Sequence, residues 1–177
     1  LKVDRQRSPQ LVSPLEAGRE MLRRKLFKEA EDFFRGQMQV HGNDELGIEA
    51  GLLLGLSQKY QGNVDGALDI LQAVATGNHV PFNTSDRIRR INAIALEQVS
   101  QIHVEREQFI DAADAACEAE RIDVGSSSSE KIREILVDRL RKGAKVITVG
   151  RDTYNTTSIL PQSTQDEILS AISRLPI

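Results

Sequence analysis

GREMLRRKLFKEAEDFF, residues 18–34, carries a pattern that two later stretches of the chain repeat. The second copy is GLSQKYQGNVDGALDIL at residues 55–71, and the third is SQIHVEREQFIDAADAA at residues 100–116. Each copy has a small residue, an apolar residue nine positions later, an alanine three positions after that, and a residue that can be buried after four more. These anchors are Gly18, Phe27, Ala30 and Phe34 in the first copy, Gly55, Val64, Ala67 and Leu71 in the second, and Ser100, Phe109, Ala112 and Ala116 in the third.

The spacing of the copies identifies the repeated unit. Ala30 and Ala67 are 37 residues apart, and Ala67 and Ala112 are 45 residues apart. Both distances fit a unit of about 34 residues with extra residues between the copies, and this period is typical of helix–turn–helix arrays. The sequence therefore predicts three consecutive helix pairs.

With these positions in place, the chain resembles the tetratricopeptide-repeat (TPR) family over roughly residues 11–124. The resemblance implies an all-α, right-handed α-solenoid of three helix pairs and a general role in protein binding. The chain departs from the family pattern in the first helices, where Pro14, Gly51 and Leu96 replace an aromatic residue, and it lacks the proline that often ends a repeat. The matching residues are Ala17-Gly18, Phe27 and Ala30-x-x-x-Phe34, then Leu54-Gly55, Gly62, Val64 and Ala67-x-x-x-Leu71, then Val99-Ser100, Phe109 and Ala112.

Apolar periodicity, glycine stops and capping residues predict eight helices. Ser13 is expected to cap the first helix, Thr84 or Ser85 the fifth, and Ser128 or Ser129 the seventh. The seventh helix carries charged residues on its outer side, so we expect it to cap the end of the array. The predicted helices cover about residues 14–24, 28–41, 44–60, 64–76, 86–106, 109–121, 130–146 and 165–174.

Four segments are predicted along the chain. They are a flexible lead at residues 1–12, the TPR-like array with its capping helix at 13–147, an extended linker at 148–163, and a short C-terminal amphipathic helix at 164–177. Val146–Val149 has strand propensity, but no partner strand is evident, so we assign it to extended chain.

The short C-terminal helix is expected to open with a capping box formed by Thr164 and Glu167. A helix of about ten residues is not stable alone in water. It must therefore dock either on its own array or on another chain.

The composition disfavours several classes of protein. The net charge of −3 argues against electrostatic binding of nucleic acid, which needs a basic face. The basic clusters at 23–25 and 87–90 are interpreted as solvated helix faces. The single cysteine, Cys117, cannot form an intrachain disulfide, which fits the cytoplasm or another reducing compartment. No apolar run approaches the length of a membrane span.

No residues with catalytic or metal-binding spacing are found, so we predict a protein that is not an enzyme and uses no metal and no cofactor. His41, His79 and His103 are scattered, and none is placed with other residues at metal-ligand spacing. Cys117 lies among alanines, so a buried and inert thiol is expected. The serine run at 126–129 is interpreted as a helix start, with phosphorylation as the alternative.

The TPR resemblance also implies where a ligand would bind, because the first helices of such repeats line the concave surface. Repeats that hold a C-terminal carboxylate use a clamp of Lys, Asn and Arg. Only Arg19 could act as a clamp donor of these types, so the chain does not resemble a carboxylate clamp. The clamp positions here are Leu15, Arg19, Leu53, Ile94 and Gln98. The contact positions transferred residue by residue are Val12, Leu15, Arg19, Leu22 and Arg23, then Glu49, Leu52, Leu56, Lys59 and Tyr60, then Ile94, Glu97, Gln101, Val104 and Glu105.

The apolar members of this set predict a channel with basic flanks in the first copy and acidic flanks in the third. Such a surface suits a helical or extended segment of another protein. We therefore predict a non-catalytic adaptor or scaffold that acts in assembly of a protein complex. The alternatives are leucines that only face a neighbouring helix, a channel filled by the chain's own C-terminal helix, a regulatory or peptide-sensing module of a larger protein, and a homo-oligomerisation domain. The channel residues are Leu15, Leu22, Leu52, Leu56, Ile94 and Val104.

Overall fold

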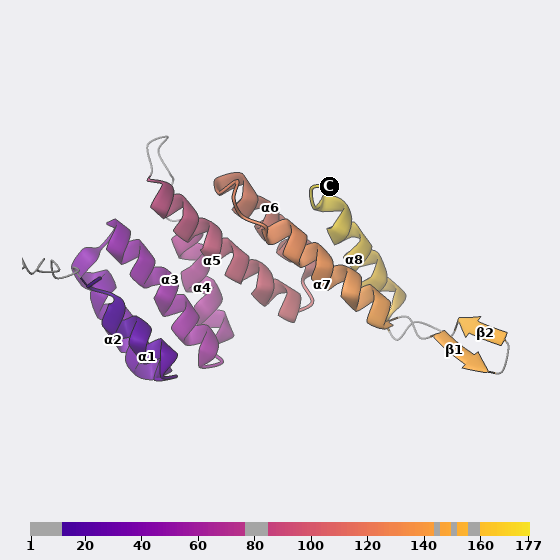
Figure 1. The fold of residues 1–177 in the computed structure, drawn as a ribbon, viewed down its shortest axis with the longest axis horizontal. Coiled ribbons are helices and arrows are strands. Elements are labelled where there is room, and N and C mark those ends of the chain that lie inside the picture. The colour runs from indigo at the N-terminus through magenta and orange to yellow at the C-terminus, as the bar shows by residue number, and fades with distance from the viewer. Residues whose placement is uncertain (1–11, 77–84, 144–145, 150–151, 156–159) are drawn as a thin grey trace, which may run out of the picture.

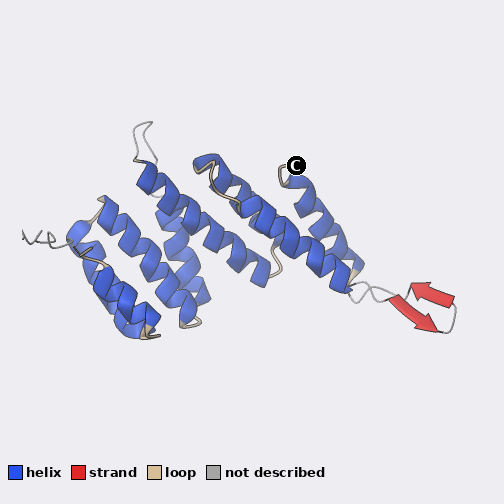
Figure 2. Ribbon diagram, in the orientation of Figure 1, coloured by secondary structure: helices blue, strands red, loops and turns tan. Residues whose placement is uncertain are grey.

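A computed structural model describes residues 12–76, 85–143, 146–149, 152–155 and 160–177. These residues form eight α-helices and one two-stranded hairpin (Figures 1 and 2). The helices are α1 (Glu16–Arg23), α2 (Phe27–His41), α3 (Glu45–Tyr60), α4 (Val64–Thr76), α5 (Asp86–Glu105), α6 (Phe109–Ile122), α7 (Ser128–Gly143) and α8 (Gln162–Arg174), and the strands are β1 (Val146–Val149) and β2 (Asp152–Asn155).

Each helix from α1 to α7 packs against the next helix in the chain. The helices follow one another in a row along the long axis of the molecule (Figure 1). In addition, α3 contacts α5 and α5 contacts α7, so these helices adjoin along one side of the row. The last helix, α8, packs against both α6 and α7.

The repeated small residues are the points where paired helices come closest. A Cβ atom on Gly18 would lie 2.5 Å from side-chain atoms of Phe33 and Phe34 on α2, and a Cβ atom on Gly55 would lie 2.7 Å from Leu71 on α4. In the third copy the Ser100 hydroxyl donates a 2.6 Å hydrogen bond to the Ala112 carbonyl on α6. The spacing found in the sequence thus reflects one type of helix contact made three times.

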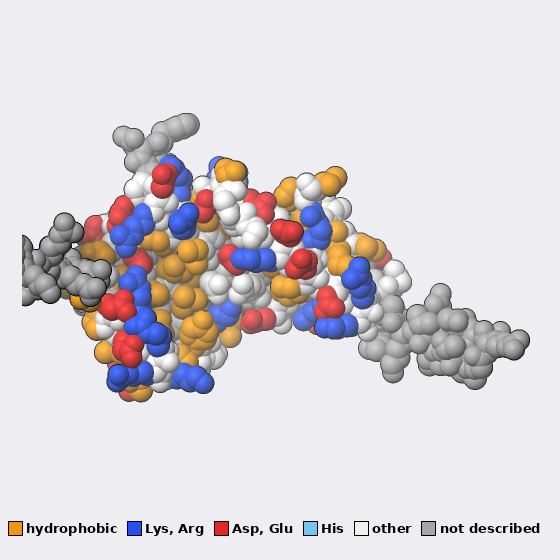
Figure 3. Space-filling model, in the orientation of Figure 1, with side chains coloured by type: hydrophobic (Ala, Val, Ile, Leu, Met, Phe, Trp, Pro, Cys, Tyr) orange, Lys and Arg blue, Asp and Glu red, His pale blue; other side chains and the backbone are white. Residues whose placement is uncertain are grey.

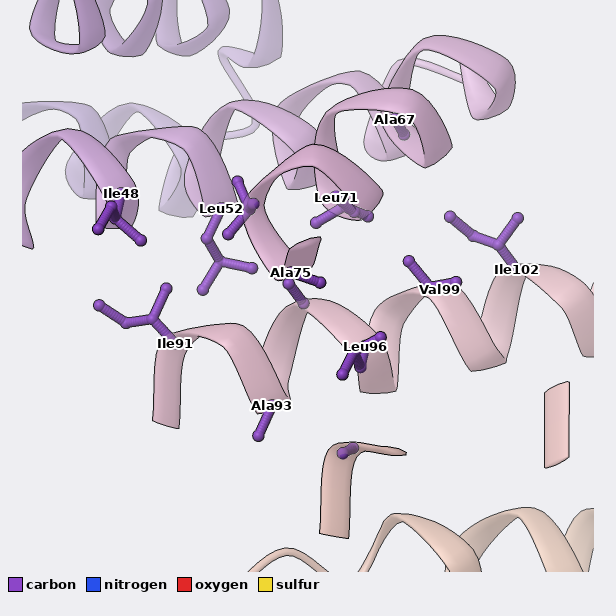
Figure 4. Close-up of a cluster of buried hydrophobic side chains, with 13 residues drawn as sticks. Ile48, Leu52, Ala67, Leu71, Ala75, Ile91, Ala93, Leu96, Val99 and Ile102 are labelled. Carbon is purple, nitrogen blue, oxygen red and sulfur yellow. The ribbon is translucent and has the colours of Figure 1, made fainter. Parts of the chain in front are cut away.

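The buried side chains form three clusters along the row. The first joins α1, α2 and α3, and the central one joins α3, α4 and α5 with part of α6. Figure 4 shows the central cluster, in which side chains from α3, α4 and α5 point toward one another. The third joins the end of α5 with α6, α7 and α8.

Capping explains where two of the helices begin. The Asp44 carboxylate accepts a 2.9 Å hydrogen bond from the Gly47 N–H, and the Ser85 hydroxyl accepts from the Ile88 N–H at 3.3 Å. These interactions satisfy N–H groups that the first helical turn leaves free. The predictions of a helix start at residue 44 and of a cap at Ser85 are therefore confirmed to within one residue.

The other predicted caps have different outcomes. The Ser13 hydroxyl accepts the Leu15 N–H at 3.3 Å in the turn that leads into α1, although the helix itself begins only at Glu16. The cap predicted for α7 is wrong, because this helix begins at Ser128, and Ser128 and Ser129 are buried in its first turn. The Glu120 carboxylate on α6 accepts the Ser129 N–H at 2.9 Å, so another helix supplies the acceptor that was expected from a serine.

The capping box predicted at the C-terminal helix is also wrong. The residue before α8 is Pro161, and Thr164 lies inside the helix. Pro161 has an extended backbone, φ −53° and ψ 147°, which suits proline and leads directly into the first turn.

The prediction that Val146–Val149 lacks a partner strand is wrong as well. β1 pairs antiparallel with β2, and Val149 lies opposite Asp152. The sequence signal that could have predicted this hairpin is Gly150-Arg151, because a glycine first in a two-residue connection is typical of hairpins.

The C-terminal helix docks on its own chain. Ile168, Ala171 and Leu175 are buried against α6 and α7. Arg174 makes two hydrogen bonds with the Asp114 carboxylate on α6, at 2.8 and 2.7 Å. Because α8 lies at this end of the row, α7 is not the last helix of the array.

Candidate protein-binding face

The contact positions predicted from the repeats lie on three adjoining helices, except Val12 and Leu15, which precede α1. We call the side of the molecule formed by these helices the α1–α3–α5 face. Ion pairs join α1 to α3 and α3 to α5, which confirms that the three helices are neighbours. The predicted residues are therefore brought together, although their exposure differs greatly.

Three of the predicted channel residues belong to the core. Leu15 is fully buried, and Leu52 and Val104 are each only 6% exposed. Leu15 packs in the cluster of α1, α2 and α3, Leu52 in the central cluster, and Val104 in the C-terminal cluster. The prediction that these side chains line an open channel is corrected, since their surfaces are covered by neighbouring helices.

The remaining apolar positions are accessible. Ile94 on α5 is 38% exposed and Tyr60 at the end of α3 is 57% exposed, while Leu22 and Leu56 are half-buried. Leu56 and Ile94 belong to none of the three core clusters. Figure 3 shows hydrophobic side chains gathered over α3 and toward α5, with charged side chains at the margin.

An ion-pair network borders the α1–α3–α5 face at the N-terminal half of α3. The Glu49 carboxylate binds Arg19 of α1 through one oxygen and Arg87 of α5 through the other, the second at 2.5 Å. Arg87 also lies 3.9 Å from Glu45. The Glu49 side chain is only 14% exposed, so this network links three helices in a partly desolvated setting.

A second polar network borders the face at the C-terminal end of α3. The Lys59 ammonium group donates to the side-chain oxygens of Gln98 and Gln101 on α5, at 3.2 and 3.3 Å. It also lies 4.0 Å from the Glu105 carboxylate. Further along α5, Glu97 pairs with Lys131 of α7 at 2.7 Å.

These networks change the role of the predicted polar contacts. Arg19, Glu49, Lys59, Glu97 and Gln101 bind neighbouring helices, as does Glu105. Arg23 pairs with Glu16 and Glu20 of its own helix. Apart from Arg23, these polar positions therefore link neighbouring helices, and the accessible surface between them is apolar.

Aromatic residues extend the apolar surface toward the turn between α1 and α2. The ring of Tyr60 packs against the ring of Phe27, with centroids 5.3 Å apart. Leu26, next to Phe27, is 41% exposed. Phe27 and Leu26 were not predicted as contact residues, because the repeat pattern uses Phe27 as a packing anchor.

A separate hollow of about 230 Å³ lies between α2, α3 and α4. Its lining includes Met38, Ile48, Gly51 and Val74, with no residue from α1 or α5 among those described. The sequence pattern did not predict this hollow, because it depends on how α2, α3 and α4 pack together. Gly47 and Gly51 are among the lining residues, but both are closely packed, since a Cβ atom on Gly51 would lie 2.9 Å from Val74.

The groups with potential chemistry are placed as follows. His41 lies 3.1 Å from the Asp44 carboxylate, and His103 lies 2.8 Å from the Gln108 side-chain oxygen. His79 is outside the described residues. Burial raises the pKa of the half-buried Cys117 thiol, whose Sγ donates to the Arg174 carbonyl at 3.5 Å.

No cluster of three or more metal-ligating side chains occurs in the part of the chain that the structure describes. Across the same residues, no helix combines the length and the apolar character that crossing a membrane requires. Within the serine run, Ser128 and Ser129 are buried and Ser127 is exposed.

Comparisons with known proteins give no match: no family model, no curated protein and no solved structure is significantly similar to this chain.

Proposed function

We propose that this chain is a TPR-like α-solenoid that acts as a non-catalytic adaptor and binds a segment of another protein on its α1–α3–α5 face. The observation that carries the proposal is the group of accessible apolar side chains on this face, Leu22, Leu56, Tyr60 and Ile94. Exposed apolar surface of this kind is unfavourable in water unless a partner covers it.

The packing supports the solenoid part of the proposal. The pairs α1–α2, α3–α4 and α5–α6 each have a small residue of the first helix against the second helix. Contacts from α3 to α5 and from α5 to α7 stack these pairs in one direction. We infer that α7 and α8 together close the C-terminal end, since their apolar residues join α6 in one cluster.

The proposed partner is a helical or extended segment with apolar anchors. Each large apolar side chain that becomes fully buried contributes roughly 1.5 to 3 kcal/mol before the costs of association are counted. Arg23 and Glu105, whose side chains are 58% and 59% exposed, lie on opposite outer helices of the face. They can orient a partner segment by charge, an effect that favours one direction of binding more than it raises affinity.

The test uses a double variant, Leu56→Glu with Ile94→Glu, and a control variant, Leu169→Glu. Leu169 is 55% exposed on α8, so the control adds a charge to an apolar surface site away from the face. Partners captured by the intact chain are purified, and their dissociation constants are measured by calorimetry with each variant. If the two anchors together contribute about 2 kcal/mol or more of binding free energy, their loss should weaken the complex at least roughly 30-fold.

Two outcomes would overturn the proposed site. One is equal affinity of the intact chain and the double variant for the same purified partner. The other is an equal loss of affinity in the control variant, because Leu169 does not lie on the face. Circular dichroism of each variant establishes that the helices are intact.

A further inference from the structure

Within the described parts of the chain, the hairpin of β1 and β2 has no extensive contact with any helix. The two strands contact each other extensively, whereas the helices of the described chain pack among themselves. In Figure 1 the hairpin projects beyond the ends of α7 and α8. A two-stranded hairpin is marginally stable in water unless a further strand or a helix covers it. Among the residues that the structure describes, the outer edge of each strand has no paired strand, so these edges are candidates for strand addition.

The two edges differ in composition. β1 reads Val-Ile-Thr-Val, which consists of β-branched residues with no charge and no proline. β2 reads Asp-Thr-Tyr-Asn and includes a charged residue and two residue types that are depleted in strands. Proteins commonly protect an edge strand with charges or proline, and β1 has neither. The unprotected edge is therefore that of β1.

We propose that β1 pairs antiparallel with β1 of a second copy of this chain, which joins the two hairpins into a four-stranded sheet. Antiparallel pairing of a strand with its own copy creates a two-fold, closed interface. In the register centred on Ile147, Ile147 lies opposite Ile147 of the second copy, and Val146 lies opposite Thr148 of the second copy, so that residues whose backbone groups point outward from β1 face each other. No like charges then face each other, so the self-pairing carries no electrostatic penalty.

The register identifies the backbone groups that would make the new bonds. Val149 and Asp152 are paired with two residues between them, so they form the hydrogen-bonded pair next to the turn. Hydrogen-bonded and non-hydrogen-bonded pairs alternate along an antiparallel ladder. The next pair, Thr148 and Thr153, therefore directs its N–H and C=O groups outward, Thr148 from the β1 edge and Thr153 from the β2 edge.

The test compares Thr148→Pro with Thr153→Pro by sedimentation equilibrium of the full chain. Proline removes one outward N–H in each variant and leaves the bonds between β1 and β2 in place. We expect the unmodified chain to dimerise with rising concentration, Thr148→Pro to lose the dimer, and Thr153→Pro to keep it. A monomeric unmodified chain, a dimer that survives Thr148→Pro, or an equal loss in both variants would overturn the proposal.

A second measurement does not depend on the folding of the variants. Amide hydrogen exchange of the unmodified chain is followed by NMR at low and high protein concentration. We expect exchange at the Thr148 amide to slow as the concentration rises and exchange at Thr153 to stay constant. Unchanged exchange at Thr148 across the dimerisation range would place the interface elsewhere and exclude pairing through β1.

Discussion

Small side chains at single positions determine how closely the paired helices approach. Gly18, Gly55 and Ser100 occupy equivalent places, and each meets the second helix of its pair. The repeat in the sequence made these contacts predictable, because only a few residue types fit where helices come so close.

Gly55→Ala should therefore destabilise the protein. The added Cβ would lie 2.7 Å from the side chain of Leu71, so either this side chain must shift or α3 and α4 must move apart, at a cost of about 1 to 3 kcal/mol. The control is Gly36→Ala on α2, where a Cβ would have no neighbour within 4 Å and alanine favours the helix by up to about 1 kcal/mol. Urea unfolding measures the free energy of unfolding of both variants. Equal changes in the two would contradict a close contact between Gly55 and Leu71.

A second prediction at the level of single residues concerns the stability of the protein at low pH. Hydrogen bonds from Gln61, and then from Arg35 and Gln58, lower the pKa of Glu31 to about 2, despite its partial burial. The folded state therefore favours the carboxylate, and this stabilisation is complete above the ordinary glutamate pKa of about 4.3 and is lost as the pH falls toward 2.

Glu31→Gln should lower the free energy of unfolding at pH 7 by about 1 to 2 kcal/mol, since Arg35 loses its charged partner. It should also flatten the loss of stability below pH 4. Urea unfolding across this pH range measures both effects, with the exposed neighbour Glu29→Gln as the control. If the free energy of unfolding of Glu31→Gln fell with pH in parallel with that of the unmodified chain, ionised Glu31 would not be the source of the acid-dependent stability.

The polar networks could not have been predicted residue by residue. Arg19 and Glu49 are 30 residues apart, and Lys59 and Gln101 are 42 residues apart. Helical periodicity places each on a side of its own helix, but pairing between helices depends on how the neighbours are rotated. For the same reason the sequence could not distinguish buried Leu52 from accessible Leu56, because α3 is apolar on nearly every side.

Whole elements were easier to predict than their ends. The interior of each helix follows from apolar spacing, and α4 has the predicted bounds. The starts of α7 and α8 were wrong because acceptors from other helices or a preceding proline can replace a capping side chain. The hairpin was missed because a strand is recognised with its partner, and β2 has a polar sequence.

At the element scale, α8 should contribute strongly to stability of the C-terminal half. Ile168 is fully buried against α6 and α7, and Ile168→Ala should cost about 2 to 5 kcal/mol. Its neighbour Leu169 is 55% exposed and provides the matched control, Leu169→Ala, which should change little. Hydrogen exchange should show faster opening of α6, α7 and α8 in Ile168→Ala than in the unmodified chain. If these helices kept the same protection in both proteins, α8 would not be held by this contact.

At the scale of the whole molecule, the Glu49 network should set the relative positions of α1, α3 and α5. Glu49→Gln leaves Arg19 and Arg87 without their shared carboxylate, and we expect a loss of about 1 to 3 kcal/mol. The control is Glu20→Gln, whose arginine partners, Arg23 and Arg24, lie at the end of the same helix and not on another, and it should have little effect. The two variants are compared by thermal unfolding at low and at high salt. Equal shifts of the unfolding temperature in both would show that the ion pairs between helices stabilise the protein no more than those within one helix.

Packing between successive helices also has a mechanical consequence. A force applied at the two ends would load the helix pairs in series, because few contacts connect distant parts of the row. The molecule should then extend in steps, each step releasing one or two helices, as expected for an array with nearest-neighbour coupling. The smallest of the three clusters holds α1 and α2, so this N-terminal pair should detach first. The α1–α3–α5 face would then lose α1 before the rest of the protein unfolds.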